Sequence, residues 1–131
     1  MKGRPDSRRV TRERTGRWSE HIAAAYLVIN GYRILARRYR SPVGEIDIIA
    51  KRGRRIAFIE VKYRATRAEA DAALTRKQAS RVARAAANWI GRNPRFAEMD
   101  QTFDAIMVLP WTWPILVRDA YQPVGTDGPT W

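Results

Sequence analysis

The chain has 131 residues, which is enough for one domain with a buried core, and its 45% apolar content argues against disorder. Its 25 Lys and Arg residues against 13 Asp and Glu give a formal net charge of +12, which favours a polyanionic partner, because phosphates are bound through basic side chains. The absence of cysteine excludes disulfides and thiolate metal sites. Since there is no apolar signal segment and no membrane-spanning run, we expect a cytoplasmic protein without membrane contact.

Residues 1–16 are rich in Lys and Arg and show no apolar periodicity, so we predict a basic flexible arm. In residues 17–30, Trp18, Ile22 and Ile29 recur at helical spacing and predict a helix that ends at Asn30-Gly31. Glu20 lies beside the apolar stripe of that helix. It is either an acid favoured by the helix dipole or a carboxylate of a functional site. The single histidine, His21, is expected on the surface.

Two strands joined by a basic turn follow the helix. Residues 32–40 predict the first strand, and residues 41–44 a turn. Arg37, Arg38 and Arg40 supply positive charge around this turn. Residues 45–50 and 56–62 alternate as two further strands around Arg52-Gly53.

The apolar pattern of this hairpin predicts its register. We expect Asp47 opposite Phe58, which places Glu45 opposite Glu60. Ile46, Ile48 and Ala50 then share an apolar face. The other face gathers four charged side chains at one end: Glu45, Asp47, Glu60 and Lys62. Such residues are rarely buried without partners, so this cluster is the candidate functional site.

The remaining chain predicts one helix and two strands. Residues 64–74 fit either a loop or a helix, and residues 75–90 form a helix in which Thr75 and Gln78 match a capping box. Residues 103–109 and 115–118 are strands, and residues 119–131 form a tail. Trp111 and Trp113, in the turn between the strands, pack against the sheet edge or form a subunit interface. A basic face of the helix is expected to bind phosphates through Lys77, Arg81 and Arg84.

Oxygen donors of this kind suit hard cations such as Mg²⁺ or Mn²⁺. Asp47 and Glu60, on neighbouring strands, are placed to share one ion with the backbone carbonyl of Val61. Glu45 either binds this metal or braces it. Lys62 is placed to orient or deprotonate a water and to offset developing charge. The alternative is a cross-strand ladder of salt bridges without catalytic function.

The order of these residues resembles the PD-(D/E)xK nuclease superfamily, with Glu20 on a helix, then Asp47, then Glu60-Val61-Lys62. A closer resemblance is to the YraN-like uncharacterised protein family. The matching pieces are residues 16–31, residues 32–35, GEIDIIA at 44–50, FIEVKYR at 58–64, Lys77-Gln78 and Phe103-Asp104.

The resemblance covers residues 16–118 and implies a restriction-endonuclease-like α/β fold in residues 17–118, with a central mixed sheet of about five strands flanked by helices. It is similar to archaeal Holliday-junction resolvases and the tRNA-splicing endonuclease domain. It implies a nucleic-acid-binding, Mg²⁺- or Mn²⁺-dependent endonuclease. Structured or branched DNA is expected rather than RNA, and a homodimer is a candidate assembly. Arg64 and Gln78 join the basic residues as expected nucleic-acid contacts. The alternatives are a non-catalytic nucleic-acid-binding module on the same fold and a protein-interaction module whose charge provides solubility.

Overall fold

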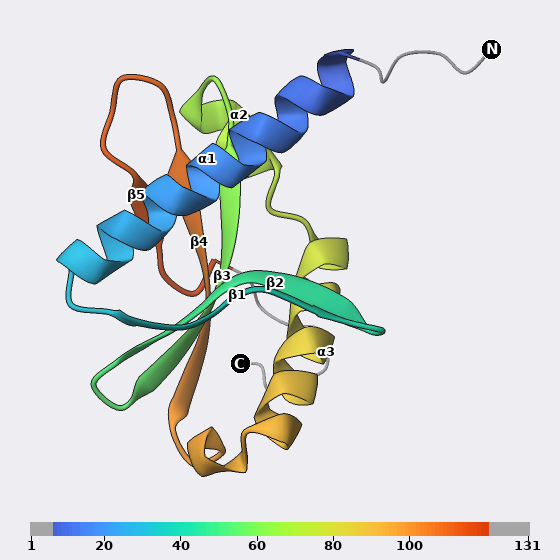
Figure 1. The fold of residues 1–131 in the computed structure, drawn as a ribbon, viewed down its shortest axis with the longest axis vertical. Helices are drawn as coiled ribbons and strands as arrows, with labels where there is room; N and C mark the ends of the chain where they lie inside the picture. The colour runs from blue at the N-terminus through green and yellow to red at the C-terminus, as the bar shows by residue number, and fades with distance from the viewer. Residues whose placement is uncertain (1–6, 121–131) are drawn as a thin grey trace, which may run out of the picture.

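The computed structural model describes residues 7–120 of the chain. These residues form a five-stranded mixed sheet with strand order β1-β2-β3-β4-β5, flanked by helices (Figure 1). The predicted α/β fold class is confirmed. The elements in chain order are α1 (Ser7–Ile29), β1 (Arg33–Ser41), β2 (Gly44–Arg52), β3 (Arg55–Tyr63), α2 (Arg67–Ala72), α3 (Arg76–Arg92), the 3-10 helix η1 (Pro94–Phe96), β4 (Asp100–Val108) and β5 (Ile115–Val117).

The strands pair antiparallel except for β3 and β4, which run parallel. A parallel pair needs a long crossover, and here α2, α3 and η1 provide it. This connection places α3 on one face of the sheet, while α1 crosses the other (Figure 1). None of the helices between residues 7 and 120 is long and apolar enough to cross a membrane.

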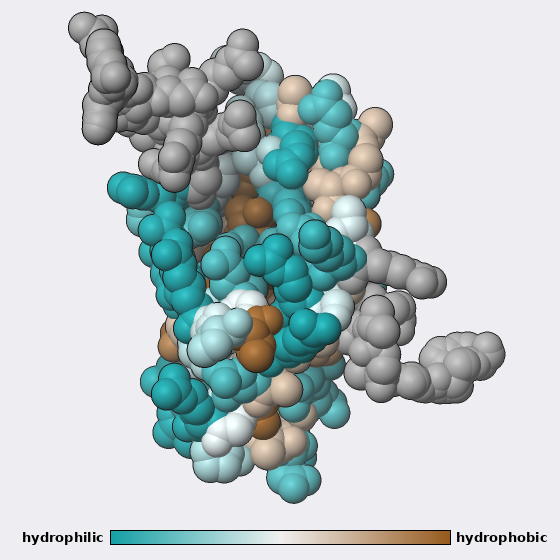
Figure 2. Space-filling view, turned by 90° about the vertical axis from the view of Figure 1, so that its right-hand side faces the viewer, coloured by the Kyte–Doolittle hydropathy of each residue, from teal (hydrophilic) through white to brown (hydrophobic). Residues whose placement is uncertain are grey.

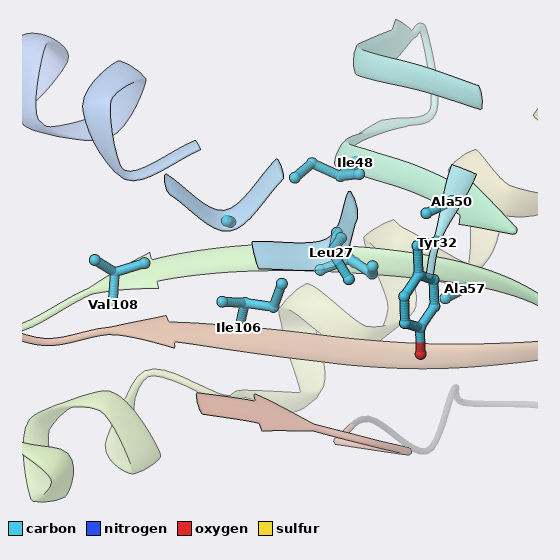
Figure 3. Close-up of a cluster of buried hydrophobic side chains, with 9 residues drawn as sticks. Leu27, Tyr32, Ile48, Ala50, Ala57, Ile106 and Val108 are labelled. Carbon is cyan, nitrogen blue, oxygen red and sulfur yellow. The ribbon is translucent and has the colours of Figure 1, made fainter. Parts of the chain in front are cut away.

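The sheet is buried on both faces, and each face has its own apolar cluster. On the α1 face, Leu27 packs with Ile48, Ile59 and Ile106, and Tyr32 closes one end of the cluster (Figure 3). On the α3 face, the cluster is built around four aromatic side chains. Those side chains are Phe58, Trp89, Phe96 and the partly buried Phe103. Apolar residues on both faces of β2 and β3 therefore reflect central strands covered from two sides.

Two predicted elements differ in extent from the observed ones. The first helix begins at Ser7, not at residue 17, so residues 7–16 of the predicted arm are helical. Arginine is a good helix former, and its propensity extends this helix without an apolar stripe. Residues 1–6 of the arm and 121–131 of the tail lie outside the described residues. The ambiguous segment 64–74 contains the short helix α2, whose N-cap is Thr66.

The predicted register of the hairpin is wrong by two residues. Ile49 pairs with Phe58, where the prediction placed Asp47. The reason is a tight turn of only Gly53 and Arg54, with Gly53 at φ 62°, at the position where glycine is favoured in two-residue hairpin loops.

A shift of two residues does not by itself move a side chain to the other face of the sheet. It does change which residues are neighbours. The last regular pair is Ile48 with Ile59, and Asp47 and Glu60 are the residues that follow this pair on the two strands. The two predicted ligands are therefore closer neighbours than the sequence alone suggested.

Regular alternation breaks at Asp47, which the sequence did not predict. Ile46 and Ile49 both pack in the α3 cluster, whereas Ile48 packs in the α1 cluster. Ile46 and Ile48 were expected on one face, and that expectation is wrong. Arg38 of β1, which the register would set opposite Asp47, has φ 53°, so the backbone of β1 is also irregular at this level. Asp47 belongs to neither apolar cluster.

Gly44 lies where the backbone of α3 approaches β2. A Cβ on Gly44 would lie 2.4 Å from the carbonyl oxygen of Arg81, a backbone atom that cannot rotate away. We expect Gly44→Ala to lower the free energy of unfolding by about 1–3 kcal/mol in urea denaturation, because α3 must shift.

The matched control is Gly91→Ala, within α3. A Cβ there meets nothing within 4 Å. This variant should leave stability unchanged or raise it by up to about 1 kcal/mol, since alanine is the better helix former. An equal loss in both variants would show that the close approach of α3 is not what requires glycine at position 44.

Candidate active site

The break in β2 brings the carboxyls of Asp47 and Glu60 together. Asp47 Oδ2 accepts a hydrogen bond from the backbone N–H of Val61 at 2.8 Å, so Asp47 points toward β3. Glu60 lies close enough to Asp47 for its negative charge to raise the pKa of Asp47.

This environment disfavours the charged form of Asp47. Burial is the largest cause, followed by the negative charge of Glu60, and together with Glu20 they raise the pKa of Asp47 from 3.8 to about 8. The hydrogen bond from Val61 acts in the opposite direction and only partly offsets the rise. Two acids, Glu20 on α1 and Glu60 on β3, therefore act on Asp47 of β2.

This pKa makes stability depend on pH. Between about pH 4 and pH 8 the folded protein keeps the Asp47 proton that the unfolded chain has lost, so the free energy of unfolding falls as pH rises. Asp47→Asn mimics the protonated acid and cannot ionise. In urea denaturation with EDTA at pH 8, we expect this variant to be more stable than wild type by at least about 1.4 kcal/mol, the equivalent of one pKa unit.

At pH 4 the difference between Asp47→Asn and wild type should nearly vanish. Asp71→Asn is the control, since Asp71 is exposed on α2, where it pairs with the equally exposed Arg67. It should change stability by less than about 0.5 kcal/mol at either pH. A constant gap between Asp47→Asn and wild type from pH 5 to pH 8 would contradict the raised pKa.

Lys62 and Gln78 complete the site around Glu60. The Nζ of Lys62 lies 3.4 Å from Glu60 Oε2, and both side chains are largely buried. Gln78 Nε2, from the first turn of α3, donates to the same oxygen at 3.2 Å. The predicted capping box is therefore half formed. Thr75 caps the backbone N–H of residue 78, but the Gln78 side chain turns to the site instead of back to the cap.

Glu20 is directed toward the site from α1. It contributes to the raised pKa of Asp47, and its Oε1 pairs with Arg38 Nε at 2.8 Å. Arg38 is the residue of β1 that has the positive φ of 53°. His21, the next residue, is exposed and its Nδ1 lies 3.1 Å from Arg37, in agreement with the surface position predicted for it.

Glu45 lies apart from these three carboxyls. It is exposed, and it forms a long ion pair with Arg40 at 3.9 Å. It is also not among the charges that raise the pKa of Asp47. Its predicted role as a ligand or brace gains no support from this geometry.

The predicted phosphate-binding residues fall into two groups. The first group is the three arginines of β1, Arg37, Arg38 and Arg40. Their side chains contact those of His21, Glu20 and Glu45. The second group is Lys77, Arg81 and Arg84 on α3. Together with Ser80 and residues 41–45 they line a pocket of about 570 Å³ between the β1–β2 turn and α3. We call it the basic pocket. Hydrophilic side chains cover most of this side of the molecule (Figure 2). Arg64 instead donates to the carbonyl of Tyr63.

The residues of this site offer some, but not all, of the ligands of a hard divalent cation. Within residues 7–120, no group of three or more His, Asp or Glu side chains is close enough to hold a metal by itself. Mg²⁺ needs only one or two carboxylates, with water and substrate oxygens completing its shell. Asp47 and Glu60 supply two carboxylates. The buried Oε1 of Gln78 has no hydrogen-bond partner among the described residues, so an acceptor beside Glu60 is left for a cation or its water.

A second buried carboxyl, Asp104 on β4, serves the fold instead. Burial raises its pKa, and it accepts hydrogen bonds from the Thr102 hydroxyl at 3.1 Å and the Asp119 backbone N–H at 2.9 Å. These bonds tie the segment after β5 to the sheet. Asp104 lies beside Ile59 in the register, on the α1 face, away from Gln78 and α3.

Sequence reasoning missed two features of the site. The first is the break at Asp47, for which the run of apolar residues at 48–50 directly after it was a signal, because a regular half-buried strand alternates. The second is the pairing of Glu20 with Arg38, which joins α1 to an edge strand. No local pattern in the sequence predicts a contact between these two elements.

The part of the chain that carries this site is similar to a group of bacterial proteins. The profile of the uncharacterised protein family UPF0102 matches residues 19–108. A UPF0102 protein of Mesorhizobium japonicum is 42% identical over 121 residues, covering 92% of this chain and 97% of its own. One from Bradyrhizobium diazoefficiens is 48% identical over 114 residues, covering 87% and 86%. One from Parvibaculum lavamentivorans is 43% identical over 110 residues, covering 84% and 83%. None of the three names states an activity.

Proposed function

The chain belongs to the uncharacterised protein family UPF0102, and from this premise we propose that it is a divalent-metal-dependent endonuclease that hydrolyses phosphodiester bonds in DNA. The family match agrees with the expected resemblance to YraN-like proteins. Membership of the wider nuclease superfamily, a cytoplasmic location and a homodimeric state belong to the proposal.

One observation carries the proposal. Two carboxyls, Asp47 and Glu60, are held close together in a largely buried site, although this raises the pKa of Asp47, and Lys62 lies beside Glu60. A ladder of salt bridges would pair each acid with a base and lower its pKa. Like charges kept together in this way are typical of sites that bind a cation or carry out acid–base chemistry.

Each side chain of the candidate active site has its own role in the proposed hydrolysis. Asp47 and Glu60 would hold Mg²⁺ or Mn²⁺, with the Val61 carbonyl as a further candidate donor. When bound, the ion would lower the pKa of a bound water and stabilise charge on the phosphate. Lys62 orients the attacking water or offsets the negative charge that develops on the phosphate. Gln78 fixes the Glu60 carboxylate through its amide.

The chain presents positive charge where a nucleic-acid backbone would lie. The basic pocket is lined by exposed Lys77, Arg81 and Arg84, on the same helix as Gln78. A strand bound there would run along α3 toward Glu60. The formal net charge of +12 provides long-range attraction for a polyanion.

The decisive experiment is cleavage of supercoiled plasmid and of a four-way DNA junction, with Mg²⁺, with Mn²⁺ and with EDTA. We expect nicked or resolved products only with metal, and none from Glu60→Gln. Binding of the same DNA in EDTA is measured in parallel. Binding without cleavage under either metal would favour a non-catalytic nucleic-acid-binding module, and absence of both at low salt would refute each nucleic-acid function.

A further inference from the structure

An apolar pocket of about 450 Å³ opens on the α1 face, at the end of the sheet that carries the site. Its walls come from α1, the end of β3 and the turn after β4. Aromatic side chains dominate its lining, chiefly Trp18, Tyr63, Trp111 and Trp113. We call it the aromatic pocket. Its volume is within the range of pockets that take small ligands or single nucleotides.

The tryptophans of this pocket are displayed to solvent. Trp111 is 100% exposed, Trp113 78% and Trp18 58%. Trp111 also has φ 65°, a backbone conformation that is unfavourable for a bulky residue. The sheet-edge packing predicted as one alternative for Trp111 and Trp113 therefore does not occur. Exposed aromatic rings held in a strained turn favour a binding role.

The aromatic pocket and the candidate active site are adjacent at the end of β3. Lys62 and Tyr63 are consecutive on β3, so their Cα atoms are about 3.8 Å apart while their side chains point to opposite faces. On α1, Trp18 and Ile22 are one turn apart and line the pocket, whereas Glu20 between them influences Asp47. A strand of nucleic acid crossing this end of β3 reaches both places.

The charge and the aromatic lining of the aromatic pocket indicate which kind of ligand it binds. Among residues 7–120, no Asp or Glu lines the aromatic pocket, so no described side chain there repels a phosphate. The formal net charge of +12 attracts a polyanion to the chain as a whole. Exposed aromatic rings are the surfaces on which unpaired bases stack, independently of sequence, while a fully paired duplex keeps its bases stacked inside.

We propose that the aromatic pocket receives an unpaired base of the nucleic acid whose phosphate lies at Asp47, Glu60 and Lys62. The substrate class is then DNA in which a nucleotide is single-stranded or can leave the stack at a branch point or a supercoiled site, not a regular linear duplex. This inference rests on the proposed function for the position of the phosphate.

The test compares two fluorescent DNAs by anisotropy in EDTA: a fully paired duplex, and the same duplex carrying a single-stranded flap. Trp111→Ala and Trp113→Ala should each weaken binding of the flap DNA about tenfold and leave the paired duplex unchanged. Trp113→Tyr should restore most of the loss. Ile29→Ala, which removes an exposed apolar side chain at the C-terminal end of α1, is the control and should change neither affinity.

A second measurement detects the stacking of a base on the tryptophan rings directly. A 2-aminopurine placed in the flap should change its fluorescence on binding wild type and not on binding Trp111→Ala. Equal weakening on both DNAs, or no weakening, would overturn the inference. So would a wild-type dimer, detected by light scattering, that Trp113→Ala converts to a monomer with unchanged flap binding, because the pocket would then be a subunit contact.

The flap preference and its loss in the tryptophan variants are measured without metal. If wild type cuts no DNA with Mg²⁺ or Mn²⁺ while this preference stands, the proposed endonuclease fails and the stacking pocket is supported. If wild type cuts a fully paired duplex as well as the flap DNA, and the tryptophan variants cut both normally, only the inference about the pocket fails.

Discussion

Lys62→Met is expected to lower the rate of metal-dependent DNA cleavage by about 10³-fold, with little change in DNA binding in EDTA. Methionine retains the length and the apolar stem of lysine, so β3 keeps its packing while the ammonium is removed. In the structure this ammonium lies 3.4 Å from Glu60 and is largely buried, where screening by water is weak. A positive charge at that position acts on the transition state far more than on a bound phosphate backbone.

Lys51→Met is the matched control. Lys51 lies on β2 at the opposite end of the strand from Asp47, opposite Ile56. Its replacement removes the same charge from the chain and should leave the cleavage rate within about twofold of wild type. Single-turnover rates on the four-way junction measure both variants. Cleavage by Lys62→Met within a few-fold of wild type would remove Lys62 from the catalytic group.

The double variant Arg81→Gln/Arg84→Gln is expected to weaken DNA binding more than tenfold at low salt. Both side chains are exposed on α3 and line the basic pocket. Binding to each phosphate releases counterions, so the slope of log affinity against log salt concentration should fall by about 0.9 for each phosphate that the variant no longer neutralises. The weakening should be the same for every DNA sequence, because interactions with phosphates carry no sequence information.

A second double variant, Arg33→Gln/Arg54→Gln, isolates position from total charge. Arg33 begins β1, and Arg54 lies in the β2–β3 turn, so both are at the end of the sheet away from the site. Titration of both double variants across a salt series should change the slope only for the α3 pair. Identical slopes would show that DNA binding depends on net charge and not on the basic pocket.

Several parts of this fold follow from local patterns. Periodicity and turn residues predict the five strands and the helix α3, because a covered strand and an amphipathic helix each repeat their apolar side chains at a characteristic spacing. The N-cap at Thr75 follows from residue type alone. The same patterns predict too short a helix α1, since its first turns carry no apolar stripe.

The register of the β2–β3 hairpin is a feature that local sequence patterns do not determine. The apolar repeat has a period of two, so a register shifted by two residues satisfies it equally well. Only the geometry of the Gly53-Arg54 turn distinguishes the two registers, and it pairs Ile48 with Ile59, the residues next to Asp47 and Glu60. The pairing of Arg38 with Glu20 is equally non-local, because it depends on where α1 crosses the sheet.

The amino-acid sequence by itself determined the class of fold and the group of Asp47, Glu60 and Lys62, because spacing along a strand decides which side chains share a face. The tertiary structure alone decided the protonation of Asp47 and the surroundings of all three side chains. The pKa of Asp47 rises because burial and two other acids converge from separate elements, and Gln78 reaches Glu60 only when α3 packs against β2. Electrostatic interactions of this kind depend on distance through space, which no spacing along the chain encodes.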